Sequence, residues 1–173
     1  MRRFLVLVAM VAALSFPAAV SADATGGQFT EPSPAGSTGG MTVSVGPVTL
    51  TARLVVTADV TVTCEPKLPN EYPISSYWED YGLTFSVKQA SGRSIAFGQA
   101  AVPFDPSVIC DGLPHVLSAS VSADPSGVAF KNGSAVVAVD GWANYSFWNS
   151  ETGESGYHRS RASTGWITAR FGR

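Results

Sequence analysis

Apolar and polar residues alternate along most of the chain after residue 40. The pattern is clearest in residues 58–64, where three small apolar residues and Cys64 alternate with Asp59, Thr61 and Thr63. A period of two places alternate side chains on opposite faces of a β-strand. The pattern therefore predicts a half-buried strand with Cys64 on its buried face, and no segment has the spacing of an amphipathic helix.

The same alternation, interrupted by turn residues, predicts an all-β domain. Residues 65–80 contain three prolines and are expected to form a long loop, and residues 81–98 a hairpin. Two long strands near the end are expected to form a hairpin that projects beyond its sheet. The expected strands span residues 41–45, 48–56, 58–64, 81–88, 95–97, 116–123, 128–130, 135–148 and 157–170.

About seven to nine short antiparallel strands with turns between them are typical of a two-sheet sandwich. A closed barrel built from the same strands is the alternative architecture. One domain suffices for a chain of this length, because domains commonly hold roughly 100–200 residues.

The N-terminal segment has the layout of a secretory signal peptide. Arg2 and Arg3 precede an apolar run over residues 4–14, and Val20-Ser21-Ala22 offers a small-x-small cleavage site. The run is short for a membrane span, which needs about 20 residues. We therefore expect a signal peptide over 1–22, a flexible Gly/Ser/Pro-rich leader over 23–40 and a folded domain over 41–173. The mature protein is expected to be secreted and extracellular, without a membrane span.

Export decides how the two cysteines are interpreted. Cys64 and Cys110 are the only ones in the chain, and an even pair in an exported protein predicts a disulfide. A redox or metal-binding pair is disfavoured, because there is no CxxC spacing and no histidine cluster. We therefore expect a Cys64–Cys110 bond with a structural role.

Charge disfavours a polyanionic partner. The chain has 11 basic and 13 acidic residues, and removal of the signal peptide would take away two of the arginines. Nucleic-acid binding needs a basic stripe that neutralises phosphates, and the remaining basic residues are mostly scattered. We expect no nucleic-acid partner.

Candidate catalytic chemistry is sparse. His115 has no accompanying nucleophile motif, and Glu79 and Asp80 should point to opposite faces of a strand, which does not suit paired-carboxylate catalysis. The dispersed aspartates do not match a calcium loop. We therefore expect no catalytic residues, no metal and no cofactor, and predict that the protein is not an enzyme.

Aromatic residues gather in two places, the 65–80 segment and the C-terminal hairpin. Exposed Tyr and Trp are typical of recognition surfaces, although core packing is the alternative use of the same residues. The candidate binding residues are Tyr72, Tyr77, Trp78, Tyr145, Trp148 and Tyr157.

These observations favour a secreted, monomeric binding module for an unknown extracellular protein or glycan. A carrier of a hydrophobic small molecule is the main alternative, and a hydrolase is a third.

Several local patterns between residues 58 and about 140 also resemble known domains. They are Val62-Thr63-Cys64, Gln89-x-x-Gly92, Cys110-Asp111-Gly112-x-x-His115 and Phe130-Lys131-x-Gly133-x-Ala135. Together they are similar to small secreted immunoglobulin-like domains of actinobacteria and related bacteria, of unknown function. The resemblance implies an exported β-sandwich and carries over no catalytic or binding residue.

Cys64 followed by Trp78 also resembles the strand B cysteine and core tryptophan of immunoglobulin domains. Cys110 departs from that pattern, because the second cysteine of an immunoglobulin domain comes late, just after a Tyr-x in strand F. The resemblance therefore implies an immunoglobulin-like two-sheet antiparallel sandwich whose disulfide joins different places.

Overall fold

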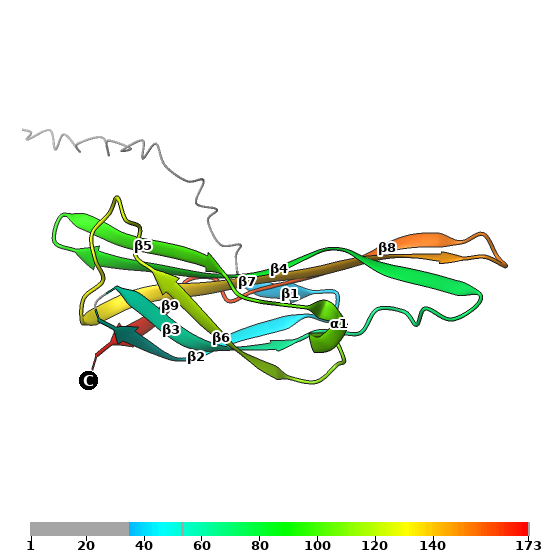
Figure 1. Ribbon diagram of the computed structural model, residues 1–173, viewed down its shortest axis with the longest axis horizontal. Coiled ribbons are helices and arrows are strands. Elements are labelled where there is room, and N and C mark those ends of the chain that lie inside the picture. Colours follow the sequence, from blue (N-terminus) through cyan, green and yellow to red (C-terminus); the bar gives the residue numbers. More distant parts are fainter. Residues whose placement is uncertain (1–34, 53, 173) are drawn as a thin grey trace, which may run out of the picture.

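The computed structural model describes residues 35–52 and 54–172, so the expected signal peptide and most of the expected leader lie outside the described residues. Two antiparallel sheets face each other (Figure 1). A short helix, α1 (Pro106–Ile109), lies between β5 and β6. The larger sheet contains β1 (Gly36–Thr38), β4 (Ile74–Ser91), β5 (Ser94–Ala101), β7 (Gly133–Asn149), β8 (Ser155–Ser163) and β9 (Ile167–Phe171). The smaller sheet contains β2 (Thr42–Thr51), β3 (Val55–Thr63) and β6 (His115–Ser122).

The strand order is that of an immunoglobulin-like sandwich. The smaller sheet has the order β2-β3-β6, which corresponds to A-B-E, and the larger sheet has β8-β7-β4-β5, which corresponds to G-F-C-C′. The all-β sandwich expected from the sequence is therefore confirmed. β1 and β9 are additions, because β1 pairs with β8 and β9 pairs with β7.

The alternating residues supply the core, as the sequence predicts. Along β3, every second residue from Val56 to Val62 is buried, and Cys64 is fully buried just beyond the strand end. The largest wholly buried side chains are Phe85, Phe130, Phe171 and Met41. Gly141 of β7 leaves room for this packing, because a Cβ there would lie 2.6 Å from the Met41 Cε atom.

The two sheets approach each other closely where β5 meets the end of β6. The Asp124 amide donates to the Phe97 carbonyl oxygen over 2.7 Å, and a Cβ on Gly98 would lie 2.3 Å from the Ser122 carbonyl oxygen. Within the described part of the chain, however, the strand ladders of the two sheets stay separate. The arrangement is a sandwich with one tight edge rather than a closed barrel.

Ordered structure begins earlier than the expected boundary at Met41. Residues 36–38, which were expected to belong to the leader, form β1 and pair with residues 161–163 of β8. The three residues of this strand pair through the backbone and are all exposed, so the sequence contains no alternation of apolar and polar residues that would predict it.

The expected loop over residues 65–80 was partly wrong, because β4 begins at Ile74. All three prolines of that segment precede this residue, and residues 74–78 pair with 145–149 of β7. The alternation is broken by a register shift between Trp78 and Asp80, which leaves Glu79 as the extra residue of a β-bulge.

The short strand expected over residues 128–130 is absent from the described structure. Phe130 is nevertheless buried there and packs edge to face on Phe171. The Gln89 side chain takes the place of a neighbouring strand, because its Oε1 accepts from the Lys131 amide and its Nε2 donates to the Lys131 carbonyl oxygen, each over 2.7 Å. This clamp joins two of the local patterns noted in the sequence.

The last expected strand, residues 157–170, is two strands. β8 pairs with residues 140–148 of β7, and β9 pairs with residues 133–137. The break contains Gly165 at a positive φ of 58°, which favours glycine. At the break, the Thr164 hydroxyl accepts from the Val139 amide over 2.9 Å.

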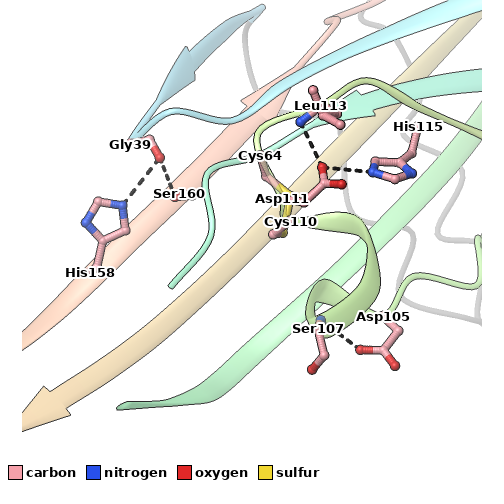
Figure 2. The surroundings of a disulfide bond; sticks show 10 residues. All are labelled: Gly39, Cys64, Asp105, Ser107, Cys110, Asp111, Leu113, His115, His158 and Ser160. Carbon is pink, nitrogen blue, oxygen red and sulfur yellow. Dashed lines mark hydrogen bonds and ion pairs between the residues drawn. A yellow bond between two sulfur atoms is a disulfide. The ribbon is translucent and has the colours of Figure 1, made fainter. Parts of the chain in front are cut away.

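The expected disulfide is present. Cys64 and Cys110 are bonded, with their Cα atoms 4.6 Å apart. The bond joins the end of β3 to the residue after α1, as Figure 2 shows. It therefore does not bridge strands B and F, in line with the departure noted in the sequence.

Replacing Gln89 by Leu should destabilise the domain by about 2–3 kcal/mol, because the Lys131 amide and carbonyl groups lose the buried Gln89 side chain as their partner. The midpoint of chemical denaturation should fall while the m-value stays unchanged. Gln99→Leu on the neighbouring β5 is the matched control and should change the stability by less than about 1 kcal/mol. Equal effects of the two substitutions would contradict the clamp.

Replacing both cysteines by alanine should remove about 4 kcal/mol of stability under the chain-entropy relation for a closed loop of this length. The separation of 46 residues between them sets that figure. Denaturation of the native chain and the double variant, each with and without a reductant, measures it. If the reductant destabilised the variant as much as the native chain, the assigned bond would be contradicted.

Candidate functional site

β4, β7 and β8 continue past the smaller sheet as a three-stranded projection (Figure 1). We define this arm as residues 74–82, 142–149 and 155–161. The expectation that the closing hairpin projects is confirmed, and β4 adds a third strand to it. A three-stranded ribbon can hold its shape where an isolated hairpin is only marginally stable.

One face of the arm carries three rings in a row across the strands. Trp78 of β4 packs edge to face on Tyr145 of β7, with the ring centroids 5.5 Å apart. Tyr145 in turn stacks on His158 of β8, with a centroid distance of 4.9 Å. Tyr145 is buried and the other two rings are half-buried. The indole Nε1 of Trp78 is buried without a hydrogen-bond partner among the described residues. Ring packing therefore holds the row together.

The His158 ring is fixed by a second contact. Its Nε2 lies 3.4 Å from the Gly39 carbonyl oxygen, which also accepts a hydrogen bond from the Ser160 hydroxyl (Figure 2). A carbonyl oxygen only accepts, so this contact places the ring proton on Nε2. His158 thus helps to hold the root of the arm against the segment before β2.

The free edge of β4 in the arm is covered by the preceding loop. The Lys67 ammonium donates to the Ser76 carbonyl oxygen over 3.0 Å, and the Ser76 amide donates to Asn70 Oδ1 over 3.4 Å. The Ser76 hydroxyl donates to the Leu68 carbonyl oxygen. These contacts occupy strand groups that could otherwise pair with another chain.

The opposite face of the arm carries exposed aromatic rings. The register places Tyr77 and Tyr157 on either side of Ser146, and Trp148 lies one row nearer the tip. Tyr77, Trp148 and Tyr157 are 58%, 50% and 47% exposed. Trp142 lies on the same face near the root, where its ring covers Gly82 so closely that a Cβ would lie 2.4 Å from it. We call these four residues the aromatic face.

A polar row divides the aromatic face. Asp80, Asn144 and Arg159 lie side by side in the register between Trp142 and the two tyrosines. The bulge also brings Glu79 to this side, because its Oε1 accepts from the Ser146 hydroxyl over 2.5 Å. The expectation that Glu79 and Asp80 point to opposite faces was therefore wrong, since a bulge interrupts the alternation.

Two members of the polar row differ in their surroundings. Asn144 is only 6% exposed, and its Oδ1 has no hydrogen-bond partner within the described structure. Arg159 instead turns its guanidinium over the Tyr157 ring at 5.2 Å, a cation–π contact. The row therefore combines a buried amide that lacks a partner with an arginine that is already engaged.

Three of the six candidate binding residues, Tyr77, Trp148 and Tyr157, meet on the aromatic face. Trp78 and Tyr145 pack on the other face of the arm. Tyr72 lies in the loop before β4 and is 83% exposed. Trp142 was not among the six candidates. It lies an even number of residues from Trp148 on the same strand, which already placed both side chains on one face.

The smaller sheet shows what an ordinary exposed face of this protein looks like. Its outer side carries mostly hydroxyl residues, with one carboxylate and two valines. These residues are Thr42, Ser44, Thr49, Thr51, Val55, Thr57, Asp59, Thr61, Thr63, Val116, Ser118, Ser120 and Ser122. We call it the hydroxyl face.

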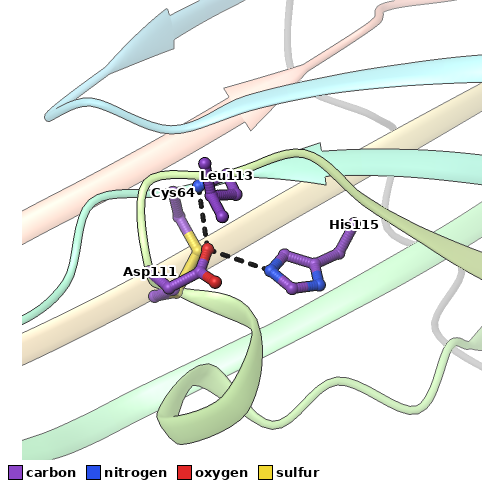
Figure 3. A network of polar contacts seen from close by, with 5 residues as sticks. Cys64, Asp111, Leu113 and His115 are labelled. Atoms are coloured by element: carbon purple, nitrogen blue, oxygen red, sulfur yellow. Dashed lines mark hydrogen bonds and ion pairs between the residues drawn. A yellow bond between two sulfur atoms is a disulfide. The ribbon is translucent and has the colours of Figure 1, made fainter.

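The second histidine is part of a turn beside the disulfide (Figure 3). His115 Nε2 lies 2.9 Å from Asp111 Oδ1, which also accepts from the Leu113 amide over 2.8 Å. In the described structure the hydrogen bonds of the His115 side chain go to Asp111 alone, so the pair fixes a turn. First the Leu113 amide and then the His115 ring hold the pKa of Asp111 below its ordinary value of 3.8.

Other features lie away from the arm. A partly open hollow near the C-terminal end is lined by Asn132, Gly133, Arg170, Phe171 and Gly172. Among residues 35–52 and 54–172, no group of three or more His, Cys, Asp or Glu side chains could hold a metal ion. No helix in that part of the chain has the length and apolarity needed to span a membrane.

Comparisons of the chain with protein-family models, curated proteins and solved structures found no match. The protein is an immunoglobulin-like sandwich whose G-F-C strands extend into an arm with an exposed aromatic face.

The lowered pKa of Asp111 predicts a pH-dependent stability. A depressed pKa stabilises the fold above the ordinary value of 3.8, and this contribution is lost as the pH falls through the lowered pKa. At about pH 7, Asp111→Asn should therefore melt below the native protein, although its side-chain oxygen can still accept from Leu113.

The difference between the two melting temperatures should shrink as the pH falls below 3.8. Asp59→Asn, on the hydroxyl face, controls for the loss of one carboxylate. A difference between Asp111→Asn and the native protein that stayed constant into strong acid would contradict the assigned turn.

Proposed function

We propose that this chain is exported and works outside the cell as a monomeric, non-enzymatic binding module without a cofactor. Its contact surface is the aromatic face, which recognises an extracellular glycan or protein. The observation that carries this proposal is the meeting of Tyr77, Trp148 and Tyr157, each about half exposed, on one side of a projecting arm. The signal-peptide layout and the disulfide support the compartment.

The contrast between the two outer faces argues that these rings have a role beyond filling a strand. The hydroxyl face is built mainly from Thr and Ser, which expose little apolar surface. The aromatic face instead leaves three half-exposed rings in water, and exposed Tyr and Trp are typical of recognition surfaces. Covering each ring would contribute about 1 kcal/mol to binding.

The arm is also held ready for a partner. The row of Trp78, Tyr145 and His158 braces it from behind, and Lys67 and Asn70 hold the edge of β4. A surface that is ordered before binding loses less conformational entropy when the partner arrives. This arrangement favours recognition by a fixed surface.

We assign no catalytic step to the chain. Asp111 and His115 form a turn beside the disulfide, and neither residue belongs to the aromatic face. A binding role requires only the rings and their polar neighbours.

The double substitution Tyr77→Ser/Tyr157→Ser should weaken partner binding while the fold survives, because both rings are exposed. Microarrays of glycans and of secreted proteins, probed with the mature chain, measure this. Two lost ring contacts should lower the affinity at least about 10-fold. Ile95→Ser, which removes a 64% exposed residue from β5, should change nothing.

Circular dichroism and the melting temperature check that the double variant folds. Absence of binding by the native chain on both arrays, or equal binding by native chain and folded double variant, would refute the proposed function.

A further inference from the structure

The proposed function leaves open which class of ligand the aromatic face takes. Resting on that function, we propose that the face binds a single chain of a linear, uncharged polysaccharide that lies along β7. Its sugar rings stack on Trp148, the two tyrosines and Trp142, and its hydroxyl groups donate to Asp80.

The dimensions of the face favour a narrow ligand. Trp148 and Trp142 are six residues apart on β7, which corresponds to about 20 Å along a strand. Tyr77 and Tyr157 are separated by two strand spacings, or about 10 Å. The area between them is thus about 200 Å², whereas each side of a stable protein interface buries about 800 Å².

The composition of the face points the same way. The centre of a protein interface is usually a dry apolar cluster surrounded by a polar rim. Here a polar row lies in the middle of the aromatic face, and the exposed aliphatic residues are elsewhere. These aliphatic residues are Leu54, Ile95, Val108, Leu113, Val116 and Ile167. Rings alternating with polar groups instead match a sugar chain, in which apolar ring faces alternate with hydroxyl groups.

The polar row offers the ligand an acceptor. Asp80 is exposed, so its carboxylate can accept hydrogen bonds from the hydroxyl groups of a sugar. Asn144 Oδ1 has almost no accessible surface, and Arg159 is already turned over Tyr157. Asp80 is therefore the member of the row that contacts the ligand.

The charges on the face favour an uncharged ligand. Glu79 and Asp80 lie on the β4 side, and Arg159 and Arg161 on the β8 side. A polyanion would meet the carboxylates and a polycation would meet the arginines, at similar distances from the middle strand. A neutral chain avoids both repulsions.

The test is isothermal titration of the mature chain with cello-oligosaccharides and chito-oligosaccharides of two to six sugars. Chitosan and polygalacturonate serve as the cationic and anionic comparisons. The affinity for one neutral series should rise with length and level off once the ligand spans the face. Tryptophan fluorescence should change on binding, because Trp148 is half exposed.

Single variants test the assigned contacts. Trp148→Ala should lower the affinity at least about 5-fold and make it level off at a shorter ligand. Asp80→Ala should lower the affinity about 3–10-fold without changing the melting temperature. Asp59→Ala, which removes a carboxylate from the hydroxyl face, is the matched control and should leave the binding unchanged.

The outcomes separate this inference from the proposed function. Binding to neither neutral series, or only to a charged polymer, would overturn the inference. A protein ligand that the Tyr77→Ser/Tyr157→Ser variant fails to bind would also overturn it while supporting the proposed function. Failure of every glycan and protein probe would overturn both.

Discussion

The structure depends on the pairing of β4 with β7. One antiparallel ladder runs from Lys88 and Val136 in the sandwich to Ile74 and Asn149 at the tip of the arm. Because the ladder is interrupted only once, at Glu79, the register that buries Phe85 and Val137 in the core also fixes which side chains face outward at the far end. A slip of one residue would expose the core residues and turn the aromatic face inward. The stability of the sandwich therefore specifies the recognition surface.

The single interruption of that ladder has a large effect on the surface. Without the bulge at Glu79, strict alternation would place Tyr77, Glu79 and Tyr81 on one face of β4. With it, Tyr77 shares its face with Asp80 and Gly82, and Tyr81 turns to the other side, where it contacts Phe104. Gly82 in turn leaves room for the Trp142 ring. One extra residue thus combines the rings and the polar row on one surface, a known use of bulges near functional sites.

Much of this fold could be predicted from the sequence, because most strands bury one face only. The alternation in β3 identified its core residues, and export predicted the disulfide. The missed elements lack that signal. β1 is paired but exposed, the start of β4 contains a bulge, and Lys131 pairs with a side chain instead of a strand. Sequence periodicity reports burial, so it cannot detect strands defined by backbone pairing alone.

The candidate site was predictable only in part, for a related reason. Aromatic clustering identified Tyr77, Trp148 and Tyr157, but the sequence could not separate them from Tyr145, which packs between Trp78 and His158. Alternation along β7 places residues 145 and 148 on opposite faces. Which β4 residues share a face with residue 148 depends on the bulge, which the sequence does not reveal. Asn144 illustrates the remaining difficulty. Its burial comes from neighbours on three strands, so its unpartnered oxygen becomes evident only once the register is known.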